Sequence, residues 1–206
     1  MASVAATAPY HRQYADLGFE REGLFAAAAE WIAPATVVYP GCSVHVTPSF
    51  RFAHVVYIDR DPAAAAFFAR HDEVMRFINS RKRYPRPAYV RFIAADYAAP
   101  LPELDGRFDL LLSLYAPGVV EACGRYLKPG GRLLTHDGMA DATAAAADPR
   151  FQREATIVLR GDRYVVEPGA GSSDARRERP APGLRGRGPA LTFRDTDTYT
   201  VFRRGG

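Results

Sequence analysis

The chain has 206 residues, of which 48% are hydrophobic and 24% are charged. This length and composition favour one globular domain over residues 1–206 and exclude collagen-like and wholly disordered classes. The formal net charge is +4, and residues 171–206 carry all of this excess, with eight arginines against four acidic residues. The remaining chain is balanced in charge, so we do not expect a basic domain surface that binds nucleic acid.

The cysteines, the N-terminal residues and the length of the apolar runs exclude further classes of protein. The two cysteines, Cys42 and Cys123, form no CxxC pair, and no His/Cys cluster has metal-ligand spacing. The sequence therefore predicts neither a disulfide framework nor a metal site. The first nine residues contain no Lys or Arg, and no apolar run reaches the roughly 18 residues of a membrane span. We expect a cytoplasmic protein with no membrane segment.

The first 135 residues alternate helical patterns with short apolar runs. Apolar residues recur at helical spacing over 19–32, and a second helix over 61–78 begins with Asp61 as its cap and Pro62. Thr47-Pro48 is typical of a cap that opens a short helix, and a further helix over 119–127 ends at the turn 128–131. The apolar runs predict five buried strands, at 36–39, 55–58, 89–93, 108–114 and 132–135.

The C-terminal part follows a different pattern. An Ala-rich helical stretch comes after Asp137, and two strand-like runs, 155–159 and 164–167, flank Gly161 as a hairpin. Residues 168–190 are rich in Arg, Gly and Pro, which predicts a mobile loop, and 198–202 predicts a last strand. The fold class is therefore α/β, with a Rossmann-like doubly wound sheet of five parallel strands plus C-terminal antiparallel strands.

Ligands of such sheets bind outside the carboxyl ends of the strands, where the strand order reverses. Gly41 follows the first strand, and Asp59 ends the second strand 18 residues later. A turn glycine followed by an acid after about 20 residues is the spacing with which nucleotide-binding folds hold ribose hydroxyls. The alternative for Asp59, a helix cap, is already supplied by Asp61. Asp96, Tyr115 and His136 stand at the ends of the remaining strands.

Five segments in this order resemble the class I S-adenosylmethionine-dependent methyltransferases, over roughly residues 36–137. The Leu-Lys-Pro-Gly-Gly turn before the last of these strands is the most specific of them. The segments are Val-Val-Tyr-Pro-Gly at 37–41, Val-Tyr-Ile-Asp at 56–59, Ile-Ala-Ala-Asp-Tyr at 93–97, Phe-Asp-Leu-Leu-Leu-Ser at 108–113 and Leu-Lys-Pro-Gly-Gly-Arg-Leu-Leu at 127–134.

The resemblance implies S-adenosylmethionine as cofactor and assigns roles by position. Gly41 would approach its methionine part, Asp59 would hold the ribose, and Asp96 would accept from the adenine amino group. Tyr97 would lie beside the adenine ring, and the segment 113–115 would border the sulfonium and the substrate. The complete set of cofactor-binding candidates is Tyr39, Gly41, Ser43, His45, Asp59, Arg60, Asp96, Tyr97 and Ser113.

The glycine loop after the first strand departs from the family pattern. Tyr39 stands where the family has an acid, and Ser43 and His45 stand where it has the second and third glycines. Those later glycines allow close backbone approach and tight helix packing. Their replacement leaves two alternatives for His45, a local packing role or a contact with the cofactor carboxylate or the substrate.

Methyl transfer needs a base only when the acceptor must lose a proton. The catalytic candidates are His136, Asp137 and Tyr115. Histidine has a pKa range suited to a general base, which favours His136 in that role; the alternative is a strand-end residue bonded to the backbone. The segment 10–14 either covers the cofactor or is a frayed terminus.

Three functions remain open. The leading hypothesis is a methyltransferase that acts on a small-molecule substrate. The second is a binding or regulatory protein that keeps the fold without catalysis, which the altered glycine loop favours. The third is a nucleic-acid methyltransferase that uses the Arg-rich loop, but that loop has no aromatic residue between Gly169 and Ala190 for base stacking. Oligomeric state is not addressed by the sequence.

Overall fold

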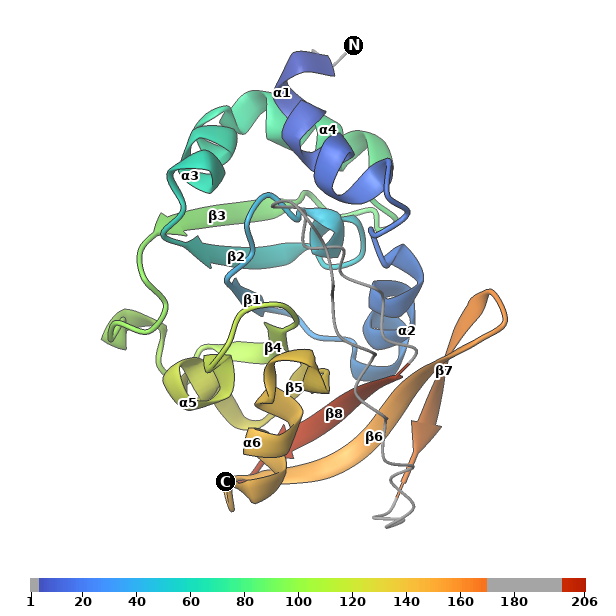
Figure 1. Cartoon of the computed structure of the whole chain (residues 1–206), viewed down its shortest axis with the longest axis vertical. Helices are drawn as coiled ribbons and strands as arrows, with labels where there is room; N and C mark the ends of the chain where they lie inside the picture. Colours follow the sequence, from blue (N-terminus) through green and yellow to red (C-terminus); the bar gives the residue numbers. More distant parts are fainter. Residues whose placement is uncertain (1–3, 170–197) are drawn as a thin grey trace, which may run out of the picture.

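One mixed sheet of eight strands organises the chain (Figure 1). The computed structural model describes residues 4–169 and 198–206. The strand order is β3-β2-β1-β4-β5-β8-β6-β7. The strands are β1 (Val37–Pro40), β2 (His54–Asp59), β3 (Tyr89–Ala94), β4 (Phe108–Ser113), β5 (Leu127–Thr135), β6 (Phe151–Arg160), β7 (Arg163–Pro168) and β8 (Thr198–Arg204).

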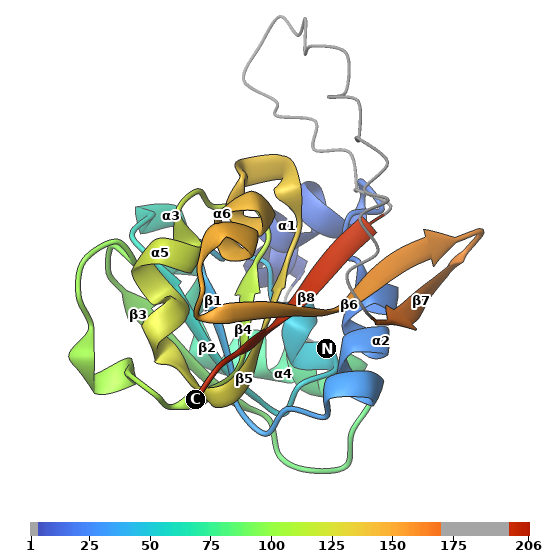
Figure 2. The ribbon, with the colours of Figure 1, turned by 90° about the horizontal axis from the view of Figure 1, so that it is seen from below.

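Strands β1 to β5 are all parallel, with β1 between β2 and β4. The last strand along the chain, β8, pairs antiparallel with both β5 and β6, and β6 pairs antiparallel with β7. This arrangement confirms the predicted fold class, including the C-terminal antiparallel strands. The hairpin of β6 and β7 extends away from the rest of the sheet (Figure 2).

Alternate residues of the central strands enter two separate cores. Val37 and Tyr39 join one core, whereas Val38 joins the other. The first core packs against helices α2 (Glu22–Ile32), α3 (Pro62–Ala69) and α4 (His71–Arg81), and the second against α5 (Val119–Cys123) and α6 (Asp141–Ala147). A sheet buried on both faces explains why its parallel strands have continuous apolar runs.

Three predicted helices differ in extent from the observed ones. The helix expected over 61–78 is two helices, because Arg70 leaves helical geometry with a ψ of 47°. The helix expected over 19–32 begins only at Glu22, because Arg21 has a left-handed φ of 54°. The helix expected over 119–127 is α5 followed by the 3₁₀ turn Gly124–Tyr126, and the glycine turn 128–131 lies inside β5.

The turn at Thr47-Pro48 is a short 3₁₀ helix (Thr47–Phe50), as expected, but Thr47 does not cap it. Val46 occupies the cap position, and the Thr47 hydroxyl shares a hydrogen bond of 2.7 Å with the Tyr10 hydroxyl. Tyr10 ends helix α1 (Val4–Tyr10) and is fully buried. Of the two alternatives for the segment 10–14, a frayed terminus is therefore wrong at Tyr10, whose helix packs against α4.

Two sequence predictions concern long segments. The predicted loop over 168–190 lies outside the described residues, except for its first two positions. Within residues 4–169 and 198–206, no helix is long and apolar enough to cross a membrane.

Candidate functional site

The strand order reverses between β1 and β4, so the crevice expected for a ligand lies between the loops that follow these strands. Gly41 follows β1 with a φ of +63°, and Ala116 lies in the loop after β4. A Cβ atom on Gly41 would stand 2.2 Å from the Cβ of Ala116. The absence of a side chain at Gly41 therefore allows the methyl group of Ala116 to pack against the Gly41 main chain.

Asp59 stands at the carboxyl end of β2, where its carboxylate joins two loops. Its Oδ2 accepts a hydrogen bond of 2.7 Å from the Ser43 N–H, and its Oδ1 accepts one of 2.9 Å from the Asp61 N–H. The side chain is half-buried, and each carboxylate oxygen can accept a further hydrogen bond. Asp59 is thus held in place and can still accept from a hydroxyl group.

A second carboxylate lies at the end of the neighbouring strand β3. Asp96 accepts from the Ala98 N–H at 3.0 Å and from Arg60 Nη1 at 2.8 Å. The Ala98 bond, aided by Arg60, lowers the pKa of Asp96 below its ordinary value. Tyr97 follows, and its hydroxyl donates to the carbonyl oxygen of Pro117 at 2.9 Å. Asp96 and Arg60 are exposed to solvent, with side-chain exposures of 39% and 75%.

The other end of the crevice is packed by aromatic residues. His45 is fully buried, and its ring nitrogens lie 3.2 Å from the Tyr39 hydroxyl and 3.2 Å from the carbonyl oxygen of Glu20. Tyr14 stacks on His45 with ring centroids 4.2 Å apart. Burial, together with the positive charge of Arg21, lowers the pKa of His45 to about 3. His45 is therefore neutral at physiological pH. Tyr39, the Glu20 carbonyl group and the Tyr14 ring hold it in place.

The replaced glycines have a structural explanation. In nucleotide-binding folds the third glycine allows a helix to pack closely on the first strand. Here only the four-residue 3₁₀ helix Thr47–Phe50 lies between β1 and β2, and it begins six residues after Gly41. Since no long helix starts at this loop, His45 has room to fold inward. Ser43 keeps a positive φ of 47°, and its hydroxyl lies 3.3 Å from Gln13 of the N-terminal segment.

Ser113, at the end of β4, is buried and bonds to a residue of helix α6. Its hydroxyl donates to the carboxylate of Asp141, which also accepts from the Val119 N–H at 3.1 Å. Asp141 is 2% exposed, and burial raises its pKa despite these hydrogen bonds. Asp141 thereby caps α5 from another helix and fixes the loop that holds Ala116. Sequence reasoning missed Asp141, and its position before an Ala-rich helix is the only signal that could have identified it.

Tyr115 and His136, which follow β4 and β5, lie together. Their ring centroids are 4.7 Å apart, and the Phe19 ring is 5.4 Å from that of Tyr115. The guanidinium of Arg21 lies 3.4 Å from the Phe19 ring centroid and 4.1 Å from the Tyr115 centroid. His136 Nδ1 accepts from the Gly138 N–H at 2.9 Å. The structure therefore brings two of the three catalytic candidates together.

Asp137 begins a 3₁₀ turn (Asp137–Met139) directly after His136. The main chain thus places it next to His136, and the orientation of its side chain lies outside the described part of the structure. No group of three or more His, Cys, Asp and Glu residues within the described ranges could hold a metal ion.

The residues at the crevice fit the two ends of S-adenosylmethionine unequally. Two carboxylates at the ends of β2 and β3 are acceptors of the kind that ribose hydroxyls and an adenine amino group need. At the methionine end, Ala116 fills the space that Gly41 leaves, and His45 bonds only to protein groups. The carboxylate end of the crevice therefore has the acceptors that a nucleoside needs, whereas the space beside Gly41 is taken by the Ala116 side chain.

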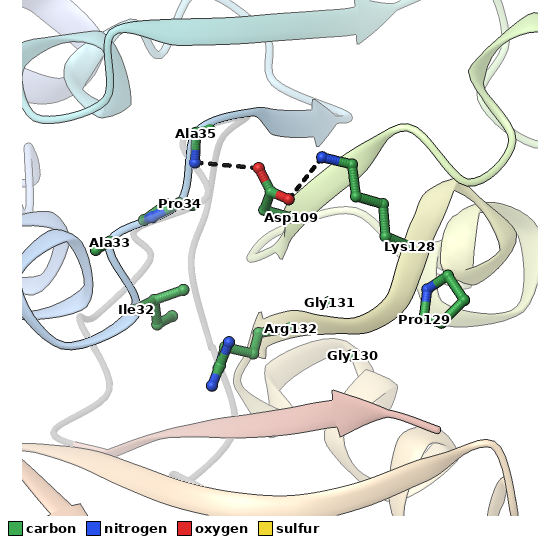
Figure 3. A pocket seen from close by; sticks show the side chains of 10 residues that line it. All are labelled: Ile32, Ala33, Pro34, Ala35, Asp109, Lys128, Pro129, Gly130, Gly131 and Arg132. Carbon is green, nitrogen blue, oxygen red and sulfur yellow. Dashed lines mark hydrogen bonds and ion pairs between the residues drawn. The ribbon is translucent and has the colours of Figure 1, made fainter. Parts of the chain in front are cut away.

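Two cavities lie away from the crevice, near the amino end of β5. One, of about 270 Å³, adjoins the amino ends of β1, β4 and β5, and Figure 3 shows its lining. In the wall of this cavity, the Asp109 carboxylate accepts hydrogen bonds from the Ala35 N–H at 3.1 Å and from Lys128 Nζ at 2.7 Å. This cavity cannot belong to the crevice, because parallel strands have their carboxyl ends on the other side.

No family model matches the chain, and no curated protein matches it. Solved structures do match. A methyltransferase from Geobacter sulfurreducens is 16% identical, with 98% of this chain and 88% of that chain covered and a TM-score of 0.53. A candidate caffeoyl-CoA O-methyltransferase from Staphylococcus aureus is 11% identical, with 100% and 93% covered and a TM-score of 0.52. At these identities the likeness concerns the fold alone, and the fold is that of the class I S-adenosylmethionine-dependent methyltransferases.

Proposed function

We propose that the chain is an S-adenosylmethionine-dependent methyltransferase that acts on a small-molecule acceptor. One observation carries the proposal. In a sheet with the methyltransferase strand order, Asp59 and Asp96 present carboxylates at the carboxyl ends of the adjacent strands β2 and β3. Asp59 is fixed by two main-chain N–H groups, so its orientation costs little entropy when a ligand binds.

Each residue at this end has a proposed role. Asp59 accepts hydrogen bonds from the ribose hydroxyls, and Asp96 accepts one from the adenine amino group in exchange for part of its contact with Arg60. Tyr97 lies beside the adenine ring and is held by its bond to Pro117. When bound, the cofactor supplies an electrophilic methyl group, so the chain's own task is to bind and orient.

His136 is proposed to orient the acceptor. Its Nδ1 accepts from the Gly138 N–H, so the neutral ring carries its proton on Nε2. In this arrangement a role as a base would need the opposite tautomer, so His136 is proposed to act by position. The surrounding rings of Tyr115 and Phe19 favour a compact, partly aromatic acceptor.

Isothermal titration of the full chain with S-adenosylhomocysteine and S-adenosylmethionine tests the cofactor site. We expect micromolar binding that Asp59→Ala weakens at least about tenfold, since a charged acceptor contributes about 1.5–3 kcal/mol. Asp72→Ala is the matched control, because that carboxylate is 97% exposed on α4. Binding by neither ligand to the folded chain would overturn the proposal, and equal weakening in both variants would remove Asp59 from the site.

A second function, binding without catalysis, is favoured by the contact between Gly41 and Ala116. If this contact keeps the methionine end closed, the chain recognises only the nucleoside part. Ala116→Gly distinguishes the two functions, since it removes the methyl group from the crevice. Tight adenosine binding and weak S-adenosylhomocysteine binding by the unaltered chain, with the latter restored by Ala116→Gly, would establish the binding protein. Equal S-adenosylhomocysteine affinity in both chains, with methyl transfer to an acceptor, would establish the enzyme.

A further inference from the structure

Two cavities share the turn Pro129-Gly130 but differ in charge balance. In the smaller cavity, both cations have acidic partners: Lys128 Nζ lies 2.7 Å from Asp109, and Arg132 Nε lies 2.9 Å from Glu154. Each positive charge there is compensated by a neighbouring carboxylate. Such a cavity has no electrostatic reason to attract an anion.

The larger cavity has a volume of about 480 Å³, which is within the range of about 300–1,000 Å³ typical of small-molecule sites. It lies where β5 and β6 begin and β8 ends. Three of its ten lining residues are arginines, and none of the ten side chains is acidic. The arginines are Arg150, Arg203 and Arg204, and the lining also includes Gln152 and the turn Pro129-Gly130.

The three arginines differ in their partners. Arg150 is compensated, since its Nη2 lies 2.6 Å from the Asp148 carboxylate. Arg204 is held by main-chain carbonyl oxygens, those of Arg125 at 3.0 Å and of Leu127, which neutralise no charge. Arg203 is exposed, and in the part of the chain that the structure describes no carboxylate forms an ion pair with it. Among the described residues, neither Arg203 nor Arg204 has an acidic side chain as ion-pair partner, and as consecutive residues of β8 they point to opposite faces of the sheet.

The surrounding main chain leaves Arg203 accessible. Gly130 has a φ of +77°, and a Cβ atom there would lie 3.7 Å from Arg203 Nη2. The guanidinium therefore rests against the turn and is not covered by a side chain. Arg203 pairs across the sheet with Gln152, whose amide adds a neutral donor to the same lining.

We propose that this cavity binds a phosphate group carried by a small molecule. The Arg203 guanidinium, with the amide of its cross-strand neighbour Gln152, suits a compact oxyanion with several acceptor oxygens, because arginine donates paired hydrogen bonds to phosphate. The cavity adjoins the amino end of the parallel strand β5, whereas Asp59 and Asp96 follow the carboxyl ends of β2 and β3. The ligand therefore does not occupy the proposed cofactor crevice, and the inference stands without the proposed function.

Calorimetric titration of the full chain with pyrophosphate at about 50 mM salt tests this site. We expect saturable one-to-one binding that weakens as salt is raised, since added ions screen partly exposed charges. Arg203→Gln should weaken binding about fivefold or more. Arg160→Gln is the matched control, because Arg160 pairs with Glu167 on the distant hairpin, and it should change binding less than twofold. Thermal unfolding of both variants checks that they remain folded.

Other results would overturn the assignment. Absence of saturation at low salt would show that the cavity does not hold phosphate. Equal weakening by Arg203→Gln and Arg160→Gln would show diffuse attraction to a basic surface. A single-stranded oligonucleotide that binds more tightly than pyrophosphate, and equally depends on Arg203, would replace the small ligand with a nucleic acid. Unchanged S-adenosylhomocysteine binding in Arg203→Gln would show that the two sites are separate.

Discussion

The two ends of the crevice between β1 and β4 are built differently. At the nucleoside end, Asp59 and Asp96 keep partly exposed carboxylates, each held by a main-chain N–H group. At the methionine end, a buried histidine and the contact between Gly41 and Ala116 fill the space with protein. The crevice therefore keeps two partly exposed carboxylates at one end, while at the other end the loop after β1 forms part of the core.

The difference has a thermodynamic consequence. Substitutions at the packed end should change the free energy of unfolding strongly, because a close-packed core tolerates neither added volume nor a misplaced charge. Substitutions at the open end should change stability little and ligand affinity more. The expected stability effects, from the largest to the smallest, test whether this division is correct.

Gly41→Ala should be the most damaging substitution. It places a Cβ atom 2.2 Å from that of Ala116 and requires alanine at a φ of +63°. Left-handed strain and overpacking each cost about 1–3 kcal/mol, so we expect a loss of about 3 kcal/mol in urea unfolding. Ala116→Gly in the same chain should restore at least about 1 kcal/mol, because it removes the overlap but not the strain.

Gly106→Ala is the control for this experiment. Gly106 has a φ of +64°, and nothing lies within 4 Å of its Cβ position, so this substitution measures the backbone strain alone. We expect a loss of about 1 kcal/mol. Equal losses in Gly41→Ala and Gly106→Ala would show that the crevice is open at Gly41, and the contrast between the two ends would then disappear.

His45 should make the chain sensitive to acid. Its folded pKa is about 3 because it is buried, whereas an unfolded histidine titrates near 6.5. Below pH 6.5 the unfolded state takes up a proton that the folded state refuses, so acidification favours unfolding. Between pH 7 and pH 5 this residue should cost roughly 2 kcal/mol. The cost should be absent in His45→Gln and unchanged in His71→Gln, which alters an exposed histidine. An imidazole NMR signal of His45 that titrates near pH 6.5 would contradict its burial.

Asp59→Asn tests the residue that connects the two ends. Asp59 accepts from Ser43 of the packed loop and from Asp61 of the open side. The amide retains one acceptor oxygen, so one of these hydrogen bonds is lost, and we expect about 1 kcal/mol less stability. Asp72→Asn should change stability by no more than a few tenths of a kcal/mol, since its carboxylate is exposed. Equal stability of the two variants would mean that Asp59 does not fix the loop.

The sequence was sufficient for the sheet, because buried parallel strands and their bounding turns are local patterns. It also placed Asp59 and Asp96 at strand ends, from spacing and from the resemblance. It did not reveal that Gly41 packs closely against Ala116. The inward turn of His45 depends on Tyr14 and Tyr39, and the cap of α5 depends on Asp141, 22 residues beyond Val119. Such contacts join distant segments and leave no periodic signal.

Arg60→Ala should have the smallest effect on stability, below about 0.5 kcal/mol, since the Arg60 side chain is 75% exposed and its ion pair with Asp96 is screened by water. The pKa of Asp96 should rise in this variant but stay below the ordinary value, because the Ala98 N–H bond remains. A carboxyl NMR titration measures that shift. S-adenosylhomocysteine affinity provides the sharper test. If the adenine amino group replaces Arg60 at the Asp96 carboxylate, removing Arg60 should leave the affinity unchanged or raise it. A loss of tenfold or more would instead make Arg60 a direct ligand contact, and the open end would then owe its affinity to a cation as well as to its two carboxylates.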